Sequence, residues 1–361
     1  MARISWGKLE SLTPDNGAIK TLRELLVMTN FLDEDLERFF TLRQNVHNGD
    51  KLGWVGEMDD VGWAGSGCNP TYKDPNINFA EKTWSIGDWQ IPLKWCYEDL
   101  EDTIAEYCLK TGTEIGDLTS TEYMDDIVMP ALDLAIKRMM WRFIWFGDTE
   151  AKNTDTGNSG GVITTDVDVE LFKTTDGFWK QLFAVCTGNG AQKTTIDANN
   201  GTNTAEQFSK LKGAGVATGI FDSILESADS RIASMEGAGI FCTKSLADAL
   251  TKDLKTQYKE ILTWEQIFRG LDVTEYNGVP VYRISIWDRF IQKYQNNGDK
   301  LNLPHRAVFG APSQLLVGTP ANQIISDLDI WFERKDRVNY LYSTGKLGCL
   351  LGEDYLFQVA Y

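Results

Sequence analysis

Histidine is almost absent from this sequence of 361 residues, which contains only His47 and His305. Two histidines cannot supply the three protein ligands of a usual catalytic zinc site, and the chain has no His-Glu-x-x-His pattern. It also has no Gly-x-Ser-x-Gly motif, which marks the nucleophile of many serine hydrolases. His47 lies in a polar stretch and His305 follows Pro304, so we expect both to be loop residues without a catalytic role.

Long hydrophobic runs and paired cysteines are missing as well. No stretch of about 18 uncharged apolar residues is present, and the first residues lack the apolar core and cleavage site of a secretory signal. We therefore expect no membrane partner. The cysteines form no Cys-x-x-Cys pair, and we expect free thiols in a reducing cytoplasm. The six are Cys68, Cys96, Cys108, Cys186, Cys242 and Cys349.

Positive charge is scarce relative to negative charge. The chain has 35 Lys and Arg against 52 Asp and Glu, a formal net charge of −17 and a pI near 4.6. Nucleic-acid affinity comes largely from clustered positive charge, so this chain is a poor candidate for direct, high-affinity DNA or RNA binding. The same excess of negative charge favours solubility and opposes premature association.

Two stretches of the sequence resemble ligand-binding loops but lack residues that such loops require. The glycine-rich stretch from Lys212 to Gly219 lacks the spacing of a phosphate-binding loop, so we expect a turn-rich loop. Asp166, Asp168 and Glu170 alternate and would share one face of a strand, where they could hold calcium, but the glycine and distal glutamate of an EF-hand loop are absent. We favour a solvated strand edge. A glycosidase could use any two carboxylates, but nothing in the sequence pairs them. Taken with the missing motifs above, this predicts no metal, no cofactor and no catalytic residue.

The composition is that of a folded protein, with 42% hydrophobic and 11% aromatic residues. Helical spacing is present over residues 21–29 and 33–46, followed by a stretch from 49 to 78 that is rich in Gly, Asp, Asn and Pro. This stretch reads as an extended loop or arm. Trp54 and Trp63 lie in it, and an aromatic residue on such a loop favours contact with a partner surface.

The middle of the chain predicts strands and one long helix. The alternation around Trp84 and Trp89 predicts two short strands, and a helix is expected over residues 97–110. Thr119 begins a capping box, which opens a helix from 119 to 146 with a continuous apolar stripe. Pro130 is expected to bend this helix, and Gly147 to stop it.

The rest of the chain mixes helices and strands, which indicates an α+β protein. Residues 148–215 are turn-rich, with an apolar segment at 178–185. The spacing predicts helices over 221–235 and 245–267, separated by a strand at 238–242. Asn277-Gly278 predicts a turn into a strand at 279–284. Further strands are expected at 306–309, 329–332, 338–343 and 355–361.

This order of elements resembles that of the major capsid proteins of tailed bacteriophages, the Hong Kong phage capsid fold. Short motifs carry the resemblance: the aromatic-Gly-Asp exit of the long helix at Trp145 to Asp148, the Gly-Val-Pro-Val run at Gly278 to Val281, and the closing strands to Tyr361. The resemblance implies an N-terminal arm (1–50), an E-loop (51–95), a P-domain (96–175) with its spine helix (119–146), an A-domain (176–305) and terminal strands (306–361) that return to the core.

The density of tryptophan from Trp84 to Trp95, with the segment from Trp141 to Asp148, is similar to capsid proteins of the crAss-like gut phages. The resemblance implies a structural virion protein, not an enzyme, that assembles with itself as pentamers and hexamers into an icosahedral shell in the host cytoplasm. Portal, scaffolding and decoration proteins are expected partners, and packaged double-stranded DNA is expected to make only weak, non-specific contact. No long charged helix precedes the arm, so a fused scaffolding domain is expected to be absent.

The inter-subunit contact candidates are tryptophans in or beside the predicted E-loop: Trp54, Trp63, Trp84 and Trp89. Two other classes stay open. An encapsulin-type cellular nanocompartment shares the fold, and cargo-enzyme genes rather than phage genes beside this one would indicate it. A carbohydrate-active enzyme would need a cleft with paired carboxylates, and a glycan hydrolysis panel tests it.

Overall fold

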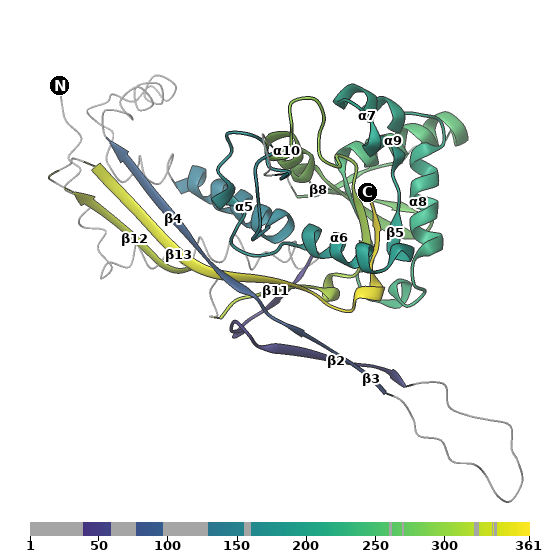
Figure 1. The fold of residues 1–361 in the computed structure, drawn as a ribbon. Helices are drawn as coiled ribbons and strands as arrows, with labels where there is room; N and C mark the ends of the chain where they lie inside the picture. Colours follow the sequence, from purple (N-terminus) through teal and green to yellow (C-terminus); the bar gives the residue numbers. More distant parts are fainter. Residues whose placement is uncertain are drawn as a thin grey trace, which may run out of the picture.

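The computed structural model describes residues 39–58, 77–96, 129–154, 160–259, 262–268, 271–320, 325–333, 335 and 338–361. Figure 1 shows a body of helices and sheets, a long ribbon of strands that extends to one side of it, and a two-stranded hairpin that extends to another. The helical pattern at 21–29, the predicted helix at 97–110 and the capping box at Thr119 lie outside the described residues.

A seven-stranded sheet forms the centre of the body. Its order is β5-β14-β10-β6-β9-β8-β7, and its pairs are both parallel and antiparallel, as expected for an α+β protein. The central strand β6 is buried at all of its positions. The strands are β5 (Lys193–Thr194), β6 (Gly239–Thr243), β7 (Glu265–Phe268), β8 (Leu271–Tyr276), β9 (Val279–Ile284), β10 (Ala307–Gly310) and β14 (Gln358–Ala360).

Helices cover both faces of this sheet. Side chains alternate along each strand, so successive residues of a buried strand contact opposite layers. On β6, Ile240 and Cys242 pack into one apolar cluster with α8 and α9, whereas Phe241 packs into the other with α5, α6 and α10. The body is therefore a three-layer arrangement with two cores. The helices are α5 (Met129–Phe146), α6 (Phe178–Gly188), α7 (Thr204–Leu211), α8 (Val216–Ser227), α9 (Lys244–Asp253) and α10 (Ser285–Tyr294).

A second sheet is built around one long strand, β13 (Val338–Leu351). Its 14 residues span about 46 Å at the rise of an extended strand. The strand β4 (Ile86–Cys96) pairs along one side, and β12 (Ile325–Glu333) and then β11 (Leu315–Gly318) pair along the other. The short strand β1 (Thr41–Arg43) joins β11 in parallel. This sheet forms the ribbon that extends from the body in Figure 1.

The end of helix α5 is fixed by close packing. Trp145 is fully buried, and its ring centroid lies 4.5 Å from that of Trp287 and 5.1 Å from that of Phe178. The helix ends at Phe146, as the sequence predicts for the residue before Gly147. Gly147 is required there because a Cβ at this position would lie 2.3 Å from the Thr175 carbonyl oxygen. The described helix begins at Met129, so the predicted start and the central bend at Pro130 are not tested.

Several predicted helices are shorter than expected. The pattern over 245–267 ends as α9 at Asp253, continues as a π-helical turn over Leu254–Tyr258, and is followed by strand β7 at Glu265–Phe268. Pairing with β8 therefore overrides the helical spacing there. The helix expected over 221–235 runs from Val216 to Ser227, so part of the predicted glycine-rich loop is its first turn.

Two strand predictions change in detail. The segment of Asp166, Asp168 and Glu170 is a turn and a 3₁₀ helix, because Asp166 has a φ of 67° and the Asp168 carboxylate accepts a hydrogen bond from the Glu170 N–H. The expected strand edge is therefore wrong. The two short strands expected around Trp84 and Trp89 are β3 (Ile77–Thr83) and the 11-residue β4. The C-terminal end of the helical pattern at 33–46 contains strand β1.

Candidate functional site: the hairpin and the outer sheet face

The hairpin consists of β2 (Lys51–Met58) and β3 (Ile77–Thr83), which form a two-stranded sheet of their own. They pair antiparallel from Lys51 opposite Thr83 to Met58 opposite Ile77. Figure 1 shows that this hairpin points away from the body. Two strands alone are marginally stable in water, so a projecting hairpin of this kind gains most from a surface that covers it.

The base of the hairpin is held by Trp84, which follows β3. Its side chain is 3% exposed and packs with Leu316 and Leu350. Its backbone N–H donates to the Asp50 carbonyl at 2.8 Å, and its carbonyl accepts from the Gly49 N–H at 2.9 Å. The hairpin therefore leaves the body from a packed and hydrogen-bonded base.

Lys82 adds a second attachment on β3. Its ammonium donates to the carbonyls of Leu351 at 3.2 Å and Gly352 at 2.7 Å, and it forms an ion pair with Asp354. These acceptors match the three donors of a lysine. The Lys82 Nζ also lies 5.9 Å from the Trp54 ring centroid. The hairpin base is thus tied to the segment that links β13 to the last strand.

One face of the long sheet, which we call its outer face, carries three aromatic side chains and a proline. These residues are Pro92, Trp331, Tyr340 and Tyr342. On β13, Leu341 is buried in the cluster that contains α5, so its neighbours Tyr340 and Tyr342 point to the opposite side. Trp331 lies opposite Tyr340 on β12, and the two rings stack at 5.3 Å with an interplanar angle of 15°. Trp331 remains 46% exposed, which is unusual for the largest apolar side chain.

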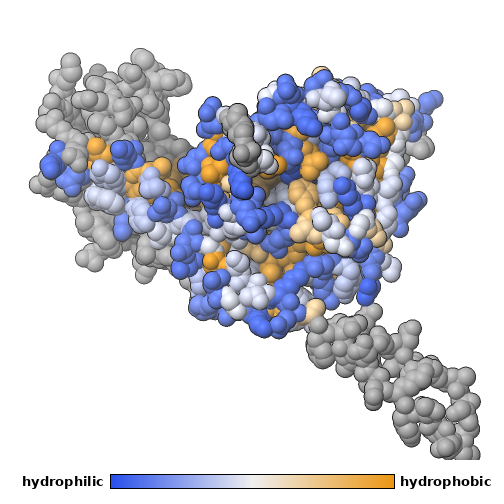
Figure 2. All heavy atoms as spheres, in the orientation of Figure 1, coloured by the Kyte–Doolittle hydropathy of each residue, from blue (hydrophilic) through white to orange (hydrophobic). Residues whose placement is uncertain are grey.

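Strand β4 borders this sheet, and in the described part of the chain it pairs on one side only, with β13. Pro92 lies within it, and proline is tolerated at an edge because it has no N–H to donate. Leu93 beside it is 43% exposed. Figure 2 shows that hydrophilic residues cover most of the face in view, with hydrophobic residues in small separate groups.

The structure separates the four tryptophans predicted as inter-subunit contacts. Trp84 and Trp89 are each 3% exposed and packed within their own chain, so an inter-subunit contact has almost no surface on them to use. Trp54 is half-buried on the hairpin, where a contact has surface to use, and Trp63 lies outside the described residues. Trp331 was not among the candidates, because alternation shows that a strand has two faces but does not show which face is covered.

His305 and the free cysteines of the described body are buried within the fold. His305 lies in a loop, as predicted, but it is fully buried: Nδ1 is 2.8 Å from the Ser245 hydroxyl and Nε2 is 3.3 Å from the Gln207 carbonyl. Burial lowers the pKa of His305 to about 4. Cys186, Cys242 and Cys349 are buried free thiols, and burial raises the pKa of each.

No group of three or more His, Cys, Asp or Glu with metal-binding geometry occurs among the residues that the structure describes. In the same residues, no helix has both the length and the apolar character needed to span a membrane.

Comparison with known proteins finds likeness in structure only. No protein-family model and no curated protein matches the sequence. The chain is similar to a chain of the satellite phage P4 procapsid with its size determination (Sid) protein, at 10% identity over 95% of this chain and 97% of that one, with a TM-score of 0.47. A structure from Mycobacterium phage Bobi aligns at 12% identity over 99% and 98% (TM-score 0.46), and the capsid of an empty GTA particle at 11% over 90% and 88% (TM-score 0.45). At these values the likeness carries no argument about function, which rests on the geometry of the chain itself.

Proposed function

We propose that this chain is the shell-forming subunit of a phage capsid, a structural virion protein that assembles with itself around double-stranded DNA. The observation that supports this proposal most is the β2–β3 hairpin, which among the described strands pairs only with itself and projects from a body to which it is firmly anchored. A monomeric protein gains little from such a projecting hairpin. A subunit that lies over its neighbours gains contact area without a larger core.

The exposed side chains of the ribbon support the same function. Trp331 and Leu93 are apolar and nearly half exposed on a sheet that extends from the body. Aromatic residues at such positions commonly anchor protein interfaces. In an assembled shell they would be covered by neighbouring subunits, as would the half-buried Trp54 of the hairpin.

The charge of the chain suits a container for DNA. A net charge of −17 repels the phosphate backbone, so the inner wall would make only weak, non-specific contact with packaged DNA. Pentamers and hexamers of this chain, with portal, scaffolding and decoration proteins, would make up the particle. The narrower likeness to the crAss-like phages stays a prediction from the tryptophan-rich segments.

The predicted organisation maps onto the described elements in this proposal. The E-loop (51–95) would contain the hairpin and most of β4, which joins the long sheet of the P-domain. The A-domain (176–305) would contain most of the seven-stranded sheet, and the terminal strands (306–361) would connect both sheets through β10, β13 and β14.

The experiment is electron microscopy of the purified protein with and without a shortened hairpin. Val55 and Phe79 are paired across the hairpin, so residues 56–78 can be replaced by an Asn-Gly turn that keeps the anchored base. We expect shells, tubes or capsomer rings from the natural chain. The shortened chain should unfold at the same temperature and remain unassembled.

The point substitution Trp331→Ala is the matched test of the outer face. Trp331 is 46% exposed, so its loss should change the unfolding temperature little while it weakens assembly. Trp89→Ala is the control, because Trp89 is buried within the chain and its loss should lower stability directly. A natural chain that stays monomeric at high concentration, with its expected scaffold present, contradicts the proposed function. Shells that hold cargo protein instead of DNA would indicate the nanocompartment alternative.

A further inference from the structure

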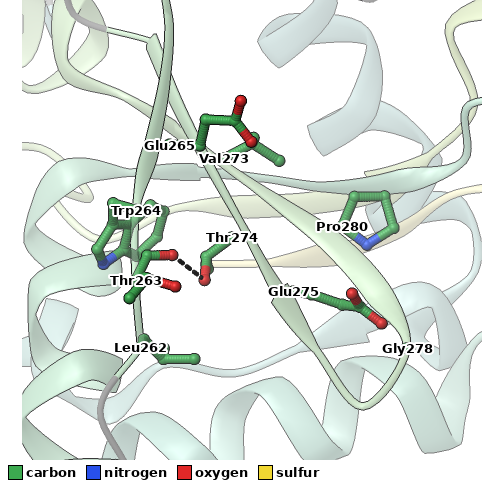
Figure 3. A pocket seen from close by; sticks show the side chains of 9 residues that line it. All are labelled: Leu262, Thr263, Trp264, Glu265, Val273, Thr274, Glu275, Gly278 and Pro280. Atoms are coloured by element: carbon green, nitrogen blue, oxygen red, sulfur yellow. Dashed lines mark hydrogen bonds between the residues drawn. The ribbon is translucent and has the colours of Figure 1, made fainter.

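A groove at the end of the seven-stranded sheet has no part in the hairpin or the ribbon. Its volume is 880 Å³, and it lies between the segment that leads into β7 and the β8–β9 hairpin. Figure 3 shows Trp264 and Thr263 on one side of the groove, with Glu275 and Pro280 on the other. The Thr274 hydroxyl donates to the Thr263 carbonyl at 3.0 Å and fixes the two walls relative to each other.

Two carboxylates line this groove without a counter-charge. Glu265 and Glu275 are both exposed, and neither forms an ion pair within the described part of the chain. Arg283 lies close by, with its guanidinium 4.6 Å from the Trp264 ring centroid, but its charge is already engaged. It forms ion pairs with Asp272 at 2.7 Å and Asp248 at 3.0 Å. The groove therefore combines an apolar wall with negative charge that is open to a cationic partner.

A complementary, positively charged surface lies on the same part of the body, next to α9. Residues 252–259, which we call the lysine segment, comprise the end of α9 and the π-helical turn after it, and they present Lys252, Lys255 and Lys259, all of them exposed. No ion pair joins these lysines to a carboxylate within the described residues. The Trp264 indole N–H donates to the Thr251 hydroxyl at 3.0 Å, so the lysine segment begins beside one wall of the groove. It stays outside the groove in its own chain.

We propose that the groove receives the lysine segment of a second copy of this chain. This inference rests on the proposed function, because shell assembly is what brings copies together. Each copy offers both halves of the contact, so a head-to-tail arrangement can close into a ring. Charge pairs at such a position fix register and exclude wrong neighbours, and salt weakens them.

Charge reversal tests this contact. One variant carries Glu265→Lys and Glu275→Lys, and the other carries Lys252→Glu and Lys255→Glu. Each variant alone places like charges in contact, and we expect the concentration for half-maximal assembly to rise about tenfold. A chain with all four substitutions, and a 1:1 mixture of the two variants, should both recover assembly. The control is Glu226→Lys with Glu236→Lys, two exposed positions of the same part of the body outside the groove, which should assemble normally.

The mixture distinguishes this inference from the proposed function. Sedimentation of the mixed variants at low salt detects their complex whether or not shells form. If the natural chain forms shells and both reversal variants assemble equally well, the groove contact is refuted and the capsid function stands. If the natural chain forms no shells but the mixture forms complexes that neither variant forms alone, the contact stands and the capsid function fails. A mixture that shows no gain over the separate variants, with all chains folded, overturns the contact.

Discussion

The indole of Trp84 occupies the space above Gly318, where any larger residue would collide with it. A Cβ at Gly318 would lie 2.6 Å from Cζ3 of the Trp84 ring and 2.9 Å from Cε3. Gly318 ends strand β11, and Trp84 fixes the base of the hairpin. The two residues therefore join the projecting hairpin to the long sheet by complementary shape.

Substitutions at this pair should not be additive. We expect Gly318→Ala to lower the free energy of unfolding by about 1–3 kcal/mol through overpacking, and Trp84→Ala to lower it by about 3–5 kcal/mol through loss of a buried ring. The alanine at 318 has nothing to collide with once the indole is gone. The double variant should therefore lose clearly less than the sum, as measured by urea unfolding of all four chains.

Gly219→Ala is the matched control for that cycle. Gly219 lies in helix α8 with no atom within 4 Å of its added Cβ, so this substitution should stabilise the chain by about 0.5–1 kcal/mol. Strict additivity of Gly318→Ala and Trp84→Ala would show that the indole does not restrict position 318.

Lys82 should control how firmly the hairpin base is held. Lys82→Met removes the donor to two backbone carbonyls and the partner of Asp354, so we expect a local loss of about 1–3 kcal/mol. Hydrogen exchange at the amides of β2 and β3 should quicken, while exchange in β6 stays unchanged. Lys51→Met is the control, because the Lys51–Glu81 pair is exposed and should contribute less than about 1 kcal/mol. Equal exchange in both variants would contradict an anchoring role for Lys82.

Arg306 should tolerate no replacement, including lysine. Its guanidinium is fully buried and donates to the carbonyls of Leu303 at 2.7 Å and Asn302 at 2.8 Å, and to the Gln295 amide oxygen at 2.5 Å. The rings within 5.4–5.6 Å of it are those of Phe146, Trp179 and Phe183. Lysine keeps the charge but not the planar fork, so Arg306→Lys should cost about 2–3 kcal/mol in urea unfolding. Arg43→Lys, at an exposed position, should change stability little, and equal effects of the two would refute this account.

The features that sequence predicts well here are those set by local chemistry. Asn277-Gly278 is a turn because both residues adopt positive φ, 51° and 77°, which these residue types tolerate. Gly147 ends α5 as expected, but it does so because the Thr175 carbonyl approaches it closely, a reason that only the folded chain reveals. The strand β11 was missed, since a run of three apolar residues and a glycine carries no period.

The sequence indicates where an extended element lies, but not how the tryptophans in and beside it are packed. The glycine-rich composition around Trp54 correctly indicated an extended element, and the hairpin is what the structure contains there. Burial of Trp84 and Trp89 was not predictable, because it depends on β11, β13 and α5, which are distant in sequence. The exposure of Trp331 has the same origin: among the residues that the structure describes, no helix covers its face of β12, whereas α5 packs on the other face of the sheet.

His305 should make the stability of the body depend on pH in the acid range. The Gln207 carbonyl can only accept, so Nε2 carries the proton and Nδ1 accepts from the Ser245 hydroxyl, which holds the imidazole neutral. Burial lowers the folded-state pKa to about 4, from about 6.5 in the unfolded chain, so the unfolded state binds the proton more tightly. The contribution is fully present above about pH 6.5 and is lost as the pH falls toward 4, by about 3 kcal/mol at most. Urea unfolding between pH 7 and pH 4 measures it, and His305→Gln should flatten that part of the profile while His47→Gln, on an exposed turn, leaves it intact. An unchanged profile in His305→Gln would mean that another group sets the acid sensitivity.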